Sequence, residues 1–104
     1  MELEEAREAV LEALRSYIRS NGRRLLTMID ALGQEEVVIY ASALYSYFRP
    51  RPGLERLETA LMLLHQLGVG ELVEGIRLVR GEPASLRVRR KVIRELLAEE
   101  EPQG

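Results

Sequence analysis

The sequence predicts a single, mainly α-helical domain that carries one small β-hairpin. Its 104 residues are enough for one compact domain, and 46% hydrophobic with 31% charged residues exclude a disordered chain. Apolar residues recur every three or four positions over five stretches, which is the period of amphipathic helices. One stretch, residues 72–79, instead places aliphatic and β-branched residues on both sides of Glu74-Gly75, a pattern typical of a hairpin turn.

The N-terminal part, residues 1–33, is expected to be helical. An apolar stripe from Leu3 to Tyr17 predicts a helix over residues 2–20, and glutamates occupy its first turn, as the helix dipole favours. Asn21-Gly22 is a typical left-handed stop, after which a second helix is predicted over residues 23–32. Because the apolar spacing nearly continues across Asn21-Gly22, one kinked helix is the alternative.

The next segment could be read as a helix or as the start of a strand. Val37-Val38-Ile39 is β-branched, which suits a strand. We predict a helix over residues 37–48, because Glu35 and Glu36 lie at its N-terminus and its length exceeds that of a typical strand.

The rest of the chain is expected to form two more helices around the hairpin. Arg49 to Gly53 is a break rich in proline, and regularly spaced leucines predict a helix over residues 54–67. After the hairpin, residues 82–104 are expected to form a last helix over residues 86–100, capped by Ser85, and an acidic tail.

The order helix 37–48, turn, helix 54–67 and hairpin resembles the winged helix-turn-helix superfamily. The resemblance covers residues 35–81, and the phrase from Leu61 to Val69 resembles the end of that superfamily's third helix entering the first wing strand. It implies a winged-helix-like core with added N- and C-terminal helices, and binding of double-stranded DNA by the second helix of the motif. The outward side of helix 54–67 departs from this pattern, because two glutamates and one arginine suit a phosphate lattice poorly. Many winged helices are protein-interaction or dimerisation modules, so the fold alone does not decide.

Charge is unevenly distributed along the chain. The formal net charge is −2, with 15 basic and 17 acidic residues. Residues 1–12 hold five Glu and one Arg, and residues 95–104 hold four Glu and no base, so residues 13–94 carry 14 basic and 8 acidic residues, a net of +6. Such a basic body could attract a polyanion, or the acidic ends could fold back upon it.

The candidate binding residues are cations on three segments of the chain, together with one tyrosine. On the last helix, i, i+3, i+4, i+7 spacing places four cations on one face: Arg87, Arg90, Lys91 and Arg94. An aromatic cluster is followed by Arg49 and Arg51, and its Tyr47 could stack on a base. The hairpin carries Arg77 and Arg80. The alternatives are a solvated face, carboxylates from another segment or subunit covering the arginines, and a core role for the aromatic residues.

We therefore expect a small, non-enzymatic nucleic-acid-binding homodimer, with DNA favoured over RNA. The alternative is an interaction or dimerisation subunit of a larger complex with no nucleic-acid contact.

Composition argues against most other classes. The chain has no cysteine, which excludes thiolate metal sites, and its single histidine and single aspartate argue against a His-rich metal site and a Ser-His-Asp triad. No metal, cofactor or small-molecule substrate is expected. No apolar run reaches the ~20 residues of a membrane span. We expect a cytoplasmic protein, and the bias toward arginine and glutamate is typical of GC-rich coding or of a thermophile.

Overall fold

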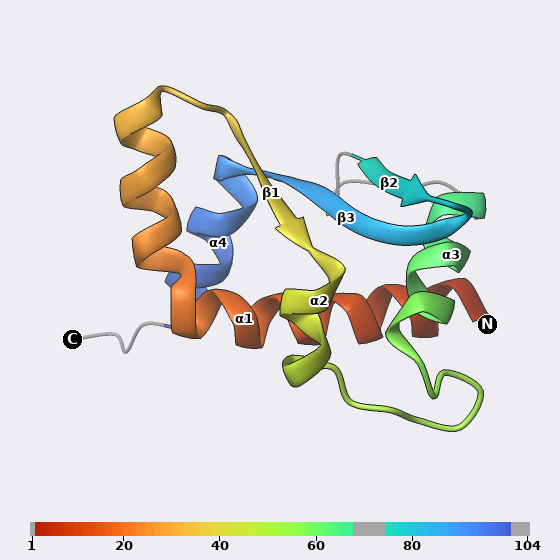
Figure 1. Ribbon diagram of the computed structural model, residues 1–104. Helices are drawn as coiled ribbons and strands as arrows, with labels where there is room; N and C mark the ends of the chain where they lie inside the picture. The colour runs from red at the N-terminus through yellow and green to blue at the C-terminus, as the bar shows by residue number, and fades with distance from the viewer. Residues whose placement is uncertain (1, 68–74, 101–104) are drawn as a thin grey trace.

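The computed structural model describes residues 2–67 and 75–100 (Figure 1). Along the chain the elements are α1 (Glu2–Leu32), β1 (Glu36–Tyr40), α2 (Ala41–Leu44), the 3-10 helix η1 (Tyr45–Tyr47), α3 (Leu57–Leu67), β2 (Gly75–Val79), β3 (Glu82–Arg89) and α4 (Arg90–Glu100). The predicted class is confirmed: the chain is mainly helical, with a small antiparallel sheet and flanking helices.

Helix α1 is one continuous helix with a bend, so the predicted stop at Asn21-Gly22 is wrong and the kinked alternative is confirmed. Figure 1 shows that α1 turns sharply about two thirds of the way along. Gly22 lies in that part of the helix, where a Cβ atom would meet Ile18 Cγ2 at 2.7 Å and Leu97 Cδ2 at 3.0 Å. The missing side chain therefore lets α4 approach α1 closely, and a glycine in mid-helix is a usual site of bending.

The prediction of a helix over residues 37–48 is wrong in its first part. Glu36–Tyr40 is strand β1, in which Val37 and Ile39 are buried while Val38 and Tyr40 are exposed. This is the period of two that a strand with one buried face requires. Tertiary pairing with β3 outweighs the length argument, and helical turns begin only at Ala41.

The hairpin turn also lies at a different place from the predicted one. Strands β2 and β3 are joined by Arg80 and Gly81, which both have positive φ, 54° and 80°. Consecutive positive φ values produce the backbone twist that a two-residue hairpin needs. The predicted turn at Glu74-Gly75 is wrong at Gly75, which begins β2, while residues 72–74 lie outside the described residues.

Strand β3 displaces the start of the last helix. It continues through Arg89, so α4 begins at Arg90 instead of residue 86, and Ser85 is buried in the strand instead of capping a helix. Leu86 and Val88 are buried opposite β1, which explains why the strand extends this far. Helix α3 likewise begins at Leu57, three residues later than predicted.

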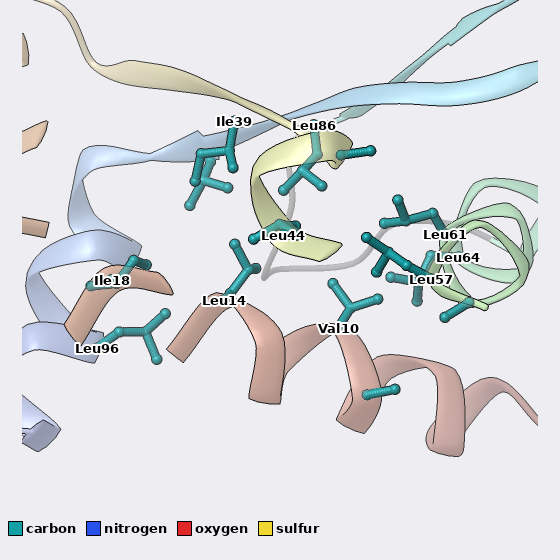
Figure 2. Packing of buried hydrophobic residues seen from close by; sticks show 14 of the residues in the cluster. Val10, Leu14, Ile18, Ile39, Leu44, Leu57, Leu61, Leu64, Leu86 and Leu96 are labelled. Atoms are coloured by element: carbon teal, nitrogen blue, oxygen red, sulfur yellow. The ribbon is translucent and has the colours of Figure 1, made fainter. Parts of the chain in front are cut away.

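The sheet has the order β1-β3-β2 with both pairs antiparallel, so β3 lies in the middle. Its inner face packs on the helices. Figure 2 shows Ile39 and Leu86 of the sheet above Leu44, with Leu14 of α1 below and the leucines of α3, among them Leu61, to one side. One hydrophobic core thus joins the elements and leaves the opposite face of the sheet to solvent.

Candidate nucleic-acid interface

The end of α1, the residue just before β1 and the start of α4 meet in a network of ion pairs. The Arg90 guanidinium lies 2.9 Å from Asp30 Oδ1 and 2.7 Å from Glu35 Oε1, and its side chain is 24% exposed. The backbone N–H of Arg90 also donates to the Glu35 carbonyl at 2.7 Å. Arg90 of α4 therefore links the end of α1 to the loop before β1, and its guanidinium is bound by two carboxylates of its own chain.

The predicted cationic face of the last helix is not a single face. Arg87 lies in β3, whereas Arg90, Lys91 and Arg94 lie in α4, so the helical spacing of all four is wrong. Arg94 shares Asp30 with Arg90, at 3.4 Å. Lys91 is exposed, and its Nζ lies 3.9 Å from the Glu95 carboxylate. The carboxylates that balance this region come from the same chain.

The break between η1 and α3 holds the next group of candidates. Arg51 exchanges backbone hydrogen bonds with Leu54 and places its guanidinium 3.3 Å from Glu12 on α1. Arg49 is exposed. The Tyr47 ring packs edge-on against Tyr17, with 5.7 Å between ring centroids. That contact fits the alternative in which the aromatic cluster packs against its own domain.

A groove of about 420 Å³ lies between α3 and the tip of the hairpin. Its lining combines apolar, polar and charged side chains of α3 and its N-terminal flank with the turn: Arg56, Glu58, Thr59, Met62, Leu63, Gln66, Gly81, Glu82 and Pro83. One cation against two carboxylates makes this a poor surface for a phosphate backbone.

Glu58 in this groove is engaged by two neighbours. The Tyr45 hydroxyl donates to Glu58 Oε2 at 2.7 Å, and Arg56 Nη2 donates to the same oxygen at 3.3 Å. The Tyr45 hydrogen bond lowers the pKa of Glu58 and, together with desolvation, raises the pKa of Tyr45. The carboxylate in the first turn of α3 is thus favoured in its ionised form.

The outer face of the sheet is different in character. Directly opposed residues of an antiparallel sheet point to the same side, so the strand register defines rows of side chains across it. One row consists of Tyr40, Ser85 and Arg77, from β1, β3 and β2 respectively. Tyr40 is 63% exposed and Arg77 is exposed, while Ser85 is buried between them.

The neighbouring rows add two more arginines. Val38, Arg87 and Gly75 form the second row, and Glu36 opposes Arg89 in the third. A Cβ atom on Gly75 would lie 2.5 Å from Arg87 Nη2, so the Arg87 guanidinium extends over the glycine. Glu36 reaches Arg87 at 3.6 Å, which is long for a tight ion pair.

Two of the hairpin cations have no acidic partner in the described part of the chain. Arg77 and Arg80 are both exposed, and neither forms an ion pair with a residue that the structure describes. Arg80 lies in the turn, at the end of the hairpin that carries Arg77. The outer face and the turn therefore combine four arginines with an exposed tyrosine.

Sequence reasoning did not include Tyr40 or Arg89 among the candidate residues. The signal that could have found them is alternation: Val37 to Tyr40 and Leu86 to Arg89 each alternate between buried and exposed positions. Reading both runs as strands places their exposed residues on one face.

Within residues 2–67 and 75–100 there is no group of three or more His, Cys, Asp or Glu that could hold a metal ion. A search of the described helices finds none that is both long and apolar enough to cross a membrane. Comparison with known proteins found no matching family model, no similar curated protein and no similar solved structure, so the geometry above is the basis for assigning a function.

Proposed function

We propose that this chain binds single-stranded nucleic acid on the outer face of its three-stranded sheet. The observation that supports it is the cross-strand register, which brings the exposed Tyr40 into line with Arg77 and next to Arg87. An aromatic ring stacks on an unpaired base of any identity, and guanidinium groups bind the phosphates beside it.

The alternative surfaces are less suited to a polyanion. At the start of α4, Asp30 and Glu35 occupy Arg90, and in the α3 groove Glu58 and Glu82 outnumber Arg56. Of the elements that carry the winged-helix resemblance, the first predicted helix is reduced to α2 and η1 after β1, and the charge of α3 does not favour its insertion into a DNA groove. A sheet face is too broad to enter that groove, which favours single strands.

Fluorescence anisotropy with labelled single strands of about 16 nucleotides tests the proposal. We expect DNA and RNA single strands to bind at low salt, more tightly than the same sequence as a duplex. The logarithm of the affinity should fall linearly with the logarithm of the salt concentration, by about 0.7 per phosphate neutralised. No binding to any single strand at low salt would overturn the proposal.

Matched variants locate the site. Tyr40→Leu should weaken binding by about 5- to 150-fold, because one lost stacking interaction is worth about 1–3 kcal/mol. Tyr45→Leu removes an exposed tyrosine from the α3 side and should leave affinity unchanged. Arg77→Gln should weaken binding and reduce the salt slope, whereas Lys91→Gln, which removes one cation from α4, should do so much less. Equal effects within each pair would rule out the sheet face.

A further inference from the structure

The two edges of the sheet are protected to different degrees. Strand β1 forms one edge and β2 the other, since β3 lies between them (Figure 1). Strand β2 carries a bulge between Arg77 and Leu78 and begins with Gly75, features that discourage a further strand from pairing. Strand β1 pairs in continuous register from Glu36 to Tyr40, with no bulge, proline or lysine.

The hydrogen-bond phase of β1 shows which backbone groups are free. Arg90 N–H donates to the Glu35 carbonyl, which makes residues 35 and 90 a hydrogen-bonded pair in the antiparallel ladder. Such pairs alternate with pairs that are not hydrogen-bonded. The N–H and C=O groups of Glu36 and Val38 therefore point away from β3, toward the open edge, as does the N–H of Tyr40.

We propose that two copies of this chain pair through β1, antiparallel, with Val38 opposite Val38 of the second copy. In that register each Glu36 lies opposite the second copy's Tyr40. The backbone groups of Val38, which are free at the edge, then bond across the two-fold axis, as isologous pairing requires.

The side chains on the outer face complement themselves in this register. Val38 is 50% exposed in one copy and contacts its equivalent across the axis, so apolar surface is removed from water on both sides. Glu36 can accept a hydrogen bond from the Tyr40 phenol of the second copy, because neighbouring strands lie about 5 Å apart. Arg87 of one copy does not come next to Arg87 of the other, because a β1 strand separates each Arg87 from the two-fold axis.

Pairing joins the two outer faces into one six-stranded sheet. The arginines of the two copies then flank a central strip formed by both β1 strands. This inference does not depend on nucleic-acid binding, and it is measured with the protein alone.

Sedimentation equilibrium over protein concentrations from about 1 µM to about 1 mM measures the pairing, and we expect the dissociation constant to lie within that range. We expect a reversible dimer of twice the 11.9 kDa chain mass. Val38→Pro should abolish it: the Val38 N–H is not part of the β1–β3 ladder, so proline removes an edge donor without breaking the sheet. A wild-type chain that stays monomeric throughout the range would overturn the proposal.

A pair of charge variants provides the control. Val38→Lys places two like charges together at the two-fold axis and should produce a monomer at all concentrations. Val79→Lys makes the same change at an exposed valine on the other edge strand and should remain dimeric. Circular dichroism establishes that each variant is folded. A dimer of unchanged affinity in folded Val38→Lys would assign dimerisation to another surface and refute pairing through β1.

Discussion

Replacing Gly22 by alanine tests how α1 and α4 pack at the bend. In an ordinary helix this substitution adds about 1 kcal/mol of stability, because glycine is a poor helix former. Here we expect the opposite sign. The new Cβ atom would lie 2.7 Å from Ile18 Cγ2 and 3.0 Å from both Cγ and Cδ2 of Leu97.

The magnitude follows from these distances and from burial. A separation of 2.7 Å is well inside carbon–carbon contact, at about 3.5–4.0 Å, so a neighbour has to move. Ile18 is fully buried and branched at Cβ, and Leu97 is 9% exposed, so neither side chain moves into solvent easily. Overpacking of this kind costs about 1–3 kcal/mol. After subtracting the gain in helix propensity, we expect Gly22→Ala to lower the free energy of unfolding by up to about 2 kcal/mol.

Urea denaturation followed by circular dichroism measures this change as a lower midpoint with an unchanged slope. Ser20→Ala is the matched control, because Ser20 is exposed on the same helix, and alanine there should stabilise the protein by a few tenths of a kcal/mol. In a Leu97→Ala background, Gly22→Ala should cost less than it does in the wild-type chain, because the cavity left by the leucine receives the new methyl group. A Gly22→Ala protein more stable than the wild type would refute the steric argument.

Two further substitutions test the polar contacts. Tyr45→Phe should destabilise the fold by less than about 1 kcal/mol, since the hydrogen bond to Glu58 is partly exposed. Because the Glu58 pKa is lowered and the Tyr45 pKa is raised, that contribution is complete between the ordinary pKa values of the two groups. It disappears as the pH falls through the folded-state pKa of Glu58 or rises through that of Tyr45, and thermal unfolding of both proteins across pH should converge at each end. Arg90→Met should cost about 1 kcal/mol at low salt by releasing Asp30 and Glu35, and urea midpoints should show a smaller loss at about 1 M salt.

The helices were predictable because their apolar stripes are long. A period of three to four sustained over α1, α3 and α4 identifies these segments as helical, and each helix lies within a few residues of its predicted place. The continuity of α1 across Asn21-Gly22 depends on packing against Leu97, which is far away in sequence. Sequence spacing could therefore offer the single kinked helix as an alternative and could not select it.

The strands were harder to predict because they are short and their pairing is long-range. Five residues from Glu36 to Tyr40 suit a helix start as well as a strand, and what makes them a strand is β3, about fifty residues later. The same partner turns residues 86–89, which continue the apolar spacing of α4, into the end of β3. Both errors have one physical cause: backbone pairing between distant segments outweighed local propensity.

Predicting helices in place of β1 and the end of β3 also led to a wrong grouping of the candidate binding residues. Placing Arg87 on a helix grouped it with Arg90 and Arg94, whereas the strand register places it beside Val38 and Gly75. A helix over residues 37–48 gives no reason to group Tyr40 with Arg77, whereas the strand register places both in one row across the sheet, on either side of Ser85. The residue types were visible in the sequence, but the face that they share is a property of the sheet.

The near-zero net charge of the chain conceals a difference between its surfaces. Carboxylates from α1 and from the loop before β1 form ion pairs with arginines elsewhere in the chain: Asp30 and Glu35 with Arg90, and Glu12 with Arg51. On the hairpin, by contrast, neither Arg77 nor Arg80 contacts a described carboxylate. Arginine binds carboxylate and phosphate through the same planar guanidinium group, so the arginines that can bind a polyanion are those with no carboxylate already bound. Among the described residues, Arg77 is such a cation, and it lies on the sheet face that also exposes Tyr40, with Arg80 in the adjoining turn; this is the surface of the proposed binding site.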